Sequence, residues 1–147
     1  MNVRAATSAD LEAVSILFDG YRQFYQQSSD LQACRDFLLQ RFQQQDSAIL
    51  VAEADDGLLG FTQLYPFFSS VRMQRIYILN DLFVSVSGRR RGVGEALMQQ
   101  AEAFGRQQKA AYLVLQTGRD NHQAQKLYEK LGWIKDSHTF YYEIELS

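Results

Sequence analysis

The segment from Leu82 to Leu97 constrains the fold most, because it passes from an apolar run through a basic, glycine-rich turn into a helical pattern. Up to Val86 the apolar residues are dense, as in a strand that is buried on both faces. From Val93 onward the apolar residues recur at helical spacing. The segment therefore predicts a buried strand that leads directly into the N-terminus of a helix.

The turn between this strand and helix has the composition of an anion-binding loop. Gly92 and Gly94 carry no Cβ atom that could keep a ligand away from the backbone. The first N–H groups of the helix can therefore point at bound oxygens, and the helix dipole favours a negative charge there. Arg89, Arg90 and Arg91 add positive potential. We expect the ligand to be a diphosphate. The turn lacks the Gly-Lys-Ser or Gly-Lys-Thr end of a Walker loop and the third glycine of a dinucleotide fingerprint.

The composition is that of a single globular domain. The chain has 147 residues, 46% of them hydrophobic and 22% charged, so we expect one domain over residues 1–147. No apolar run is long enough to span a bilayer, and the N-terminus lacks the apolar core of a secretory signal, so we expect a cytoplasmic protein that needs no membrane. A net charge of -2 argues against nucleic acid as a partner. The single cysteine, Cys34, excludes an internal disulfide and is expected to be a packing residue.

The remaining periodicities and turn signals predict the order strand, two helices, three antiparallel strands, helix, strand, helix and two strands. A helix of crossover length separates the strand that ends at Val84 from the strand Ala111–Gln116, which favours a buried, parallel arrangement of these two strands. The expected strands are Met1–Ala5, Ala48–Ala54, Leu58–Tyr65 closed by Pro66, Arg75 or Ile76 to Val84, Ala111–Gln116, Trp133–Lys135 and Phe140–Leu146. Residues Phe67–Ser70 are expected to form a loop. The expected helices span Leu11–Tyr25, Leu31–Phe42, Val93 to about Gly105, and a last one that Asp120 or Asn121 caps and Gly132 stops.

Two motifs resemble those of one known family. The spacing R-x-x-G-x-G over Arg89–Gly94 resembles the coenzyme-A pyrophosphate loop of the GCN5-related N-acetyltransferases (GNAT). The pattern N-x-x-A-x-x-x-Y-x-x-x-G-W over Asn121–Trp133 is similar to the second signature of the same family. With the order of elements, the resemblance covers nearly the whole chain. It implies an α/β (α+β) GNAT fold: a mixed, mostly antiparallel sheet of about seven strands, four helices, a central parallel pair that splays apart, and acetyl-CoA as cofactor.

The resemblance also implies where acetyl-CoA binds. Leu82, Phe83 and Val84 would lie along the acyl-pantetheine arm, and the loop residues including Val93 would hold the diphosphate. Asn121 and Ala124 would lie near the other side of the cofactor. The Tyr128 hydroxyl would reach the coenzyme sulfur as the proton donor. Alternatively, Tyr128 simply packs against the sheet from the apolar stripe of its helix.

Acyl transfer to an amine also needs a proton acceptor. A primary amine has a pKa of about 10.4, so it is protonated at neutral pH. Removing that proton at pH 7 costs roughly 4.6 kcal/mol, which corresponds to about 3.4 pKa units. Asn80 and Asp81 interrupt an apolar strand, where polar residues are costly without a task or a partner. The segment from Gly60 through Val84 resembles the spermidine/spermine N-acetyltransferases, which have a glutamate where this chain has Asn80 and use it in proton removal. Asparagine can only orient a water. Asp81 is then a base through water, an anchor for a cationic substrate, or a structural carboxylate.

Aromatic residues suggest where an acceptor amine enters. They could form a wall that favours a cation, although aromatics at helical spacing are more often part of a core. The residues concerned are Tyr21, Tyr25, Tyr65, Phe67 and Phe68. His122 and His138 have no partner at metal-ligand spacing, and we assign no metal.

The resemblance, together with these residues, implies an enzyme that moves the acetyl group of acetyl-CoA to an amine by direct attack. The acceptor is a small molecule, a polyamine-like amine, or the lysine or N-terminal amine of a peptide. No covalent intermediate is expected, because Cys34 lies in the wrong part of the chain to act as a nucleophile. The alternative from another class is a non-catalytic acyl-CoA sensor or partner-binding module. The family often forms dimers through its C-terminal strands, so Phe140–Leu146 is either a homodimer interface or part of the core.

Overall fold

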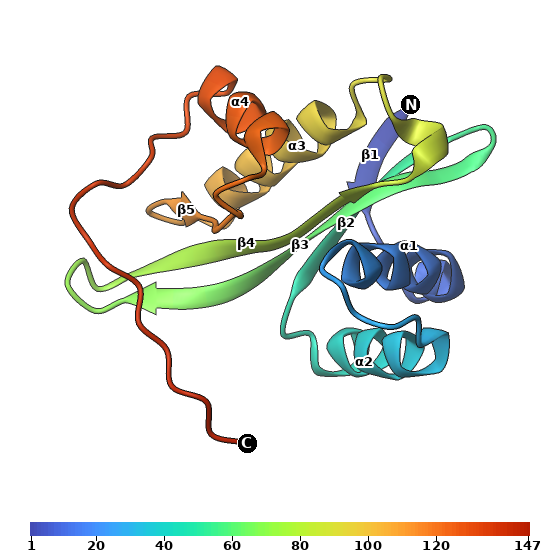
Figure 1. Ribbon diagram of the computed structural model, residues 1–147, viewed down its shortest axis with the longest axis horizontal. Coiled ribbons are helices and arrows are strands. Elements are labelled where there is room, and N and C mark those ends of the chain that lie inside the picture. The colour runs from blue at the N-terminus through green and yellow to red at the C-terminus, as the bar shows by residue number, and fades with distance from the viewer. The chain divides into compact units, whose positions relative to one another are not determined.

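The computed structural model describes all 147 residues as two compact units, Met1–Gln116 and Thr117–Ser147. The first unit is a five-stranded sheet in the order β1-β2-β3-β4-β5 together with three helices (Figure 1). Its strands are β1 (Asn2–Ala5), β2 (Ala48–Ala54), β3 (Gly57–Ser69), β4 (Gln74–Val84) and β5 (Leu113–Val114). Its helices are α1 (Leu11–Phe24), α2 (Leu31–Gln44) and α3 (Val93–Gln107), and the second unit contains α4 (His122–Lys130).

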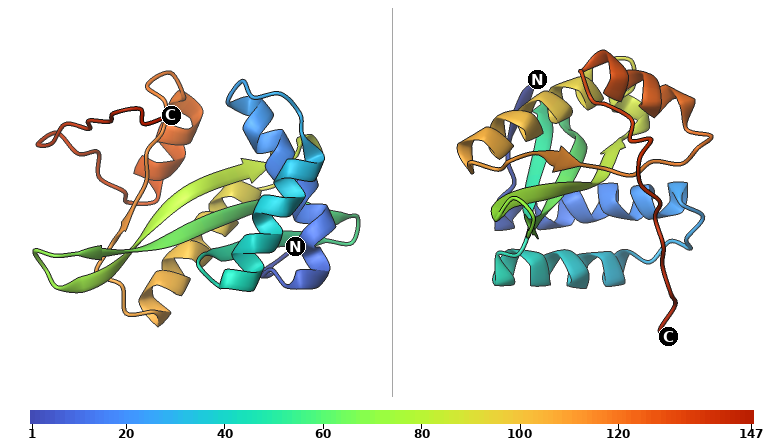
Figure 2. Two further views of the ribbon diagram at one scale, coloured as in Figure 1. Left: turned by 90° about the horizontal axis from the view of Figure 1, so that it is seen from below. Right: turned by 90° about the vertical axis from the view of Figure 1, so that its left-hand side faces the viewer.

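The helices of the first unit lie on both faces of its sheet. Figure 2 shows α1 and α2 on one face and α3 on the other. Both α1 and α2 turn a stripe of apolar residues at helical spacing toward the strands. The hydrophobic core on this face includes Val14, Cys34, Leu38, Val51 and Phe61. The α3 face is closed by the buried stripe Val93, Leu97, Met98 and Ala101. The expected role of Cys34 as a packing residue is confirmed.

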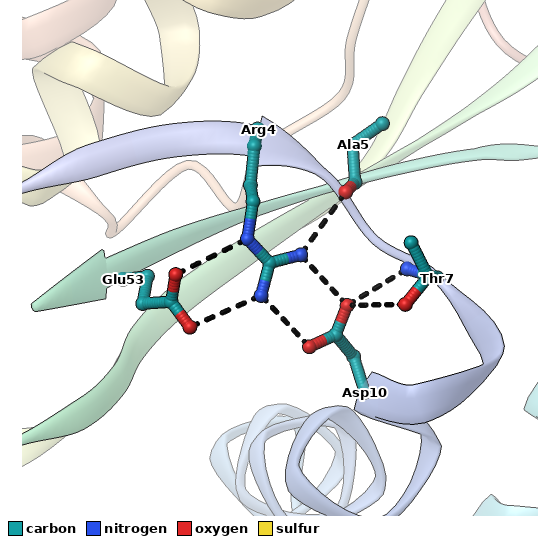
Figure 3. Close-up of polar contacts among 5 residues, drawn as sticks. All are labelled: Arg4, Ala5, Thr7, Asp10 and Glu53. Atoms are coloured by element: carbon teal, nitrogen blue, oxygen red, sulfur yellow. Dashed lines mark hydrogen bonds and ion pairs between the residues drawn. The ribbon is translucent and has the colours of Figure 1, made fainter.

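An arginine holds the edge strand β1 to the start of α1 (Figure 3). The Arg4 guanidinium donates two hydrogen bonds to Asp10, at 2.8 and 2.9 Å, and two to Glu53, at 3.2 and 3.1 Å. The Thr7 N–H also donates to the Asp10 carboxylate, at 2.7 Å. This cluster raises the pKa of Arg4 and lowers the pKa of Asp10 and Glu53, because each charge is stabilised by its partner. It therefore ties β1 and the turn that follows it to β2, which is distant in the sequence.

The β3–β4 hairpin is longer than the sequence predicted. The expectation that β3 ends at Tyr65 is wrong, because β3 runs through Pro66 to Ser69 and pairs with β4 along that length. Phe67 and Phe68 are thus strand residues and do not lie in a loop. The pairing of β2 with β3 stops at Leu64, so beyond that point one side of β3 is an edge. A proline is tolerated there because no strand needs its missing N–H.

The two closing strands that the sequence predicted are absent. Residues 133–147 contain no strand, and β5 is limited to Leu113–Val114 within the predicted Ala111–Gln116. The sheet therefore has five strands where about seven were expected, whereas the mixed α/β class and the four helices are confirmed. An alternating pattern forms a strand only when a neighbouring backbone supplies its hydrogen bonds. The structure shows no strand pairing at Phe140–Leu146.

The parallel pair of the sheet is short. β4 and β5 pair at Tyr77–Leu113 and Ile78–Val114 only, and in parallel as expected. β4 then continues to Val84 without pairing with β5. The side of β4 that faces away from β3 is therefore open to another partner from Leu79 to Val84. None of the helices combines the length and the apolar character that crossing a membrane requires.

Candidate active site

The basic turn brings the N-terminus of α3 to the end of β4. A short 3-10 helix, Val86–Gly88, follows β4, and Arg90 and Gly92 then adopt the left-handed conformation with φ of 63° and 75°. The first backbone hydrogen bond of α3 runs from the Ala96 N–H to the Gly92 carbonyl, at 3.1 Å. The N–H groups of Val93 and Gly94 come before that bond, so they are available to an anion at the helix end.

Glycine at position 92 is favoured by the left-handed backbone conformation and also leaves space beside the loop. A Cβ atom added at Gly92 meets no atom within 4 Å, so the space beside this part of the loop is open. Arg91 approaches Asp56 at 3.5 Å, whereas Arg89 and Arg90 form no ion pair in the chain. Both side chains are exposed. An open left-handed glycine, a helix N-terminus and exposed guanidinium groups are features that a diphosphate site would use. Binding of a diphosphate at this turn stays a prediction.

Packing against β3 fixes the position of this loop. The Ser85 N–H donates to the Leu59 carbonyl at 2.8 Å, and a Cβ atom at the buried Gly88 would lie 2.9 Å from the same oxygen. Val93 is 1% exposed and lies beside Gly60 of β3. The helix end is therefore held by the sheet on both sides of the turn.

The residues expected along the pantetheine arm are half-buried at the end of β4. Leu82, Phe83 and Val84 pair with Thr62, Phe61 and Gly60 of β3, respectively. Their other side is the part of β4 that β5 does not cover. Backbone groups on this side remain for a ligand to contact.

A buried carboxylate lies next to these residues on β4. Asp81 is 2% exposed, and the Gln63 side chain donates to its Oδ2 at 2.8 Å. The Asn80 side chain donates to its Oδ1, also at 2.8 Å. The Ser47 hydroxyl in turn donates to Gln63 Oε1 at 2.8 Å, which orients the glutamine amide toward Asp81. The four side chains form one chain of hydrogen bonds.

Burial dominates the electrostatics of this cluster. It raises the pKa of Asp81, and the two hydrogen bonds from Asn80 and Gln63 oppose the increase only in part. Burial and the nearby charge of Asp81 also raise the pKa of Tyr65 to about 12. Asp81 is therefore a stronger proton acceptor than an exposed carboxylate, and Tyr65 stays protonated.

The structure brings some of the predicted aromatic residues to this cluster. The Tyr21 hydroxyl donates to the Asn80 carbonyl at 3.0 Å, and the Tyr21 and Tyr25 rings lie 5.1 Å apart. Tyr65 lies close enough to Asp81 for its pKa to respond. Phe67 and Phe68 lie farther along β3 toward the hairpin turn, where the Arg75 guanidinium is 4.8 Å from the Phe68 ring.

The second unit holds the residues of the other motif. Asn121 caps α4, because its side chain accepts a hydrogen bond from the Ala124 N–H at 3.3 Å. Tyr128 is half-buried on α4, 6.2 Å from the Trp133 ring, and its carbonyl accepts from the Trp133 N–H at 2.9 Å. The motif thus forms a capped helix whose end is closed by the tryptophan. His122 and His138 are exposed.

Sequence reasoning missed Gln63 and Ser47. A signal was present, since Thr62 and Gln63 interrupt the apolar run of β3 just as Asn80 and Asp81 interrupt β4. Only the register of the hairpin, which places Gln63 opposite Asp81, shows that the two interruptions belong together.

Comparison with known proteins identifies the family. Residues 12–133 match the acetyltransferase (GNAT) family. YhfO of Bacillus subtilis, an uncharacterized N-acetyltransferase, is 46% identical over 142 residues, which cover 97% of this chain and 95% of the relative. The crystal structure of a probable acetyltransferase is 38% identical and has a TM-score of 0.94, covering 100% of this chain and 99% of the other.

A more distant solved structure shares the fold. An aminoglycoside N-acetyltransferase in complex with CoA is 21% identical with a TM-score of 0.81, covering 97% of this chain and 93% of the other. The chain belongs to the GNAT family, and it is an acetyl-CoA-dependent N-acetyltransferase.

Proposed function

We propose that this protein acetylates a primary amine that carries a positive charge in solution, by direct attack of the amine on the thioester of acetyl-CoA. The observation that carries the proposal is the turn between β4 and α3, where a left-handed Gly92 opens the backbone beside the N-terminus of α3. The buried Asp81 lies farther back on the same strand. One strand thus supplies both an anion-binding end and a proton acceptor.

The cofactor is proposed to be held by backbone and by charge. Arg89, Arg90 and Arg91 would hold the diphosphate together with the N–H groups of residues 92–94. Leu82, Phe83 and Val84 would hold the pantetheine arm on the side of β4 that β5 leaves open. Asn121 and Ala124 are proposed as further contacts because they belong to the second family motif. The bound thioester supplies an acetyl group that is already activated for transfer.

Asp81 is proposed as the base. A primary amine reaches the site mainly as its ammonium form, which must lose a proton before the nitrogen can attack. Burial raises the pKa of Asp81 toward neutrality, which strengthens it as a base. Asn80 cannot accept this proton, because an amide is not basic at neutral pH. Asp81 would therefore take the proton on a carboxylate oxygen.

Tyr128 is proposed as the acid. It would hold a proton on its hydroxyl oxygen and donate it to the leaving thiolate sulfur. The second family motif supports this role, because Tyr128 occupies the tyrosine position of that motif.

The acceptor is proposed to be recognised as a cation. Tyr21 bonds to the Asn80 backbone, Tyr25 packs on the Tyr21 ring, and Tyr65 lies close to Asp81. Aromatic faces near a carboxylate favour an ammonium group. Phe67 and Phe68 would extend this aromatic wall toward the hairpin turn. Polyamines, lysine peptides and amino acids therefore belong in a substrate panel. Aminoglycosides belong there as well, since one enzyme of this fold is an aminoglycoside N-acetyltransferase.

The test is a calorimetric titration with acetyl-CoA, followed by an assay of thiol release against these four classes of amine. We expect binding, and release with one class. Tyr128→Phe should slow release by about 10²- to 10⁴-fold and leave binding nearly unchanged. Tyr141→Phe, an exposed tyrosine of the same unit, is the matched control and should change neither.

Each other outcome has a distinct meaning. If Tyr128→Phe releases thiol as fast as wild type, Tyr128 is not the acid. Binding without release for every amine would favour an acyl-CoA sensor over an enzyme acting on these amines. Absence of binding would refute the diphosphate site at the loop.

We also propose that the chain forms one acetyltransferase domain and assembles as a homodimer. The family match spans residues 12–133 and so includes parts of both units. In Phe140–Leu146 the even-numbered residues are apolar and 81–90% exposed, which is the pattern of a strand without a partner. A second copy of the chain would supply that partner. The cytoplasmic location stays a prediction.

Sedimentation velocity tests the homodimer. The double variant Tyr142→Asp/Ile144→Asp should sediment as a monomer, because it places charges on the apolar side of the segment. Glu143→Gln, on the opposite side, should sediment like the wild type. A wild-type protein that sediments as a monomer at high concentration would contradict the proposal.

A further inference from the structure

The side chains of Asn80 and Asp81 make an unusual contact for neighbours in a strand. Successive side chains of a regular strand point to opposite faces, yet Asn80 Nδ2 lies 2.8 Å from Asp81 Oδ1. A β-bulge explains this. Gln63 pairs with Asp81 and Leu64 pairs with Leu79, so Asn80 is an extra residue on β4. Bulges turn a side chain away from its regular direction, and here the bulge turns the amide of Asn80 onto the carboxylate.

The two oxygens of Asp81 have different surroundings. Oδ2 is bound by Gln63, which is fully buried and is itself fixed by Ser47. Oδ1 is bound by Asn80, whose side chain is exposed. The backbone of the bulge is held separately, because the Tyr21 hydroxyl donates to the Asn80 carbonyl. Rotation of the Asn80 side chain away from Oδ1 would therefore not require the strand to move, and it would uncover Oδ1 and leave Oδ2 bound by Gln63.

Asp81 also has no cationic partner. Both hydrogen bonds to its oxygens come from neutral amides, and none of the ion pairs of the chain includes it. A buried carboxylate is costly when no positive charge compensates it. A primary ammonium offers N–H donors as the amide of Asn80 does, but with a full positive charge. Its hydrogen bond to a carboxylate is correspondingly stronger.

We propose that the Asn80 side chain is a cap on Asp81 Oδ1, and that the ammonium group of the acceptor displaces it and binds in its place. The inference rests on the proposed function in naming an amine as the ligand. It goes further in naming the oxygen that receives the amine, the residue that must move, and the chemical class selected. A neutral alcohol of the same shape lacks the charge and does not displace the cap.

The cap predicts a direct spectroscopic response. The probe is n-butylammonium chloride, with 1-butanol and sodium chloride as matched controls. The side-chain amide signals of Asn80, assigned by their loss in Asn80→Ala, are followed by ¹⁵N–¹H NMR. We expect them to shift saturably with butylammonium and not with either control. The shift should vanish in Asp81→Asn, whose fold is checked by circular dichroism. Unchanged Asn80 signals at saturating butylammonium would refute the cap.

Removing the cap provides the second test. Asn80→Ala should bind butylammonium about tenfold more tightly, because a hydrogen bond to a charged group that must be broken is worth about that factor. Gln99→Ala, an exposed amide on α3, should bind as the wild type does. Equal or weaker binding by Asn80→Ala would mean that Asn80 does not compete with the amine, and the proposal would be wrong. These measurements use no acetyl-CoA. The cap can therefore be confirmed even if no acetyl transfer is detected, and it can be refuted even if acetyl transfer is detected.

Discussion

A single methyl group added at Gly60 should disturb the acetyl-CoA loop from inside the fold. Gly60 lies on β3 opposite Val84, and its missing side chain faces α3. A Cβ atom there would lie 2.7 Å from the Phe83 carbonyl oxygen, 3.1 Å from Val93 Cγ1 and 3.3 Å from Leu97 Cδ1. The oxygen belongs to the backbone of β4, so it cannot move without disturbing the pairing of β3 with β4. Relief must come from displacement of α3 or of the strand.

The size of the effect follows from this geometry. Overpacking of a well-packed interior costs about 1–3 kcal/mol. For a chain of this length each kcal/mol lowers the melting temperature by about 2–4 °C, so Gly60→Ala should melt about 2–12 °C below the wild type. Val93 is the first residue of α3, so its displacement should also weaken the binding of acetyl-CoA.

Thermal unfolding followed by circular dichroism measures the stability, and calorimetry measures the affinity. Gly118→Ala is the matched control, because a Cβ atom there meets nothing within 4 Å and the residue has no positive φ. It should melt at the wild-type temperature or slightly above, since alanine restricts the unfolded chain. If Gly60→Ala had the same melting temperature as Gly118→Ala, the inference that β3, β4 and α3 are closely packed at Gly60 would be refuted.

Three further predictions concern the loop and the carboxylates. The φ of residue 92 is left-handed, so Gly92→Ala should lose about 1–2 kcal/mol of stability and bind acetyl-CoA more weakly. Gly92→Asn should lose less stability, because asparagine adopts this conformation more readily than alanine. Equal losses of stability in the two variants would contradict a conformational cause. The hydrogen bond from Arg4 lowers the pKa of Asp10 from 3.8 to about 2, so this stabilisation is present above the ordinary value and is lost as the pH falls through the lower one. The melting temperature of the wild type should therefore fall more steeply over that acid range than that of Asp10→Asn, and parallel curves would refute the linkage. Burial raises the pKa of Asp81 above its ordinary value of 3.8. Its contribution to the stability of the fold is therefore fully present at a pH below 3.8 and is lost as the pH rises through the raised pKa. Asp81→Asn should accordingly melt higher than the wild type at neutral pH and turn over more slowly, and a lower melting temperature would show that Asp81 is structural.

The sequence was informative wherever structure depends on local interactions. Helices follow from the spacing of apolar residues and from capping side chains. Asn121, one of the two expected caps, does cap α4, and Asp30 caps α2. The loop at Arg89–Gly94 was also readable, because a helix N-terminus and its glycines are features of consecutive residues. For the same reason the order of helices and strands was correct as far as α4.

Tertiary structure alone decided what depends on pairing between distant segments. β3 extends past Pro66 because it pairs with β4 as far as Ser69, and β2 no longer pairs with it there. Phe140–Leu146 forms no strand despite its alternation. The environment of Asp81 is of the same kind. Its neighbours Gln63 and Ser47 come from other strands and loops, and the bulge at Asn80 exists only in the register of the hairpin. The sequence by itself therefore determined the family, the helices and the glycine-rich turn before α3, whereas the fold determined the burial of Asp81 and the partners of its two oxygens, because burial and register are properties of the assembled sheet.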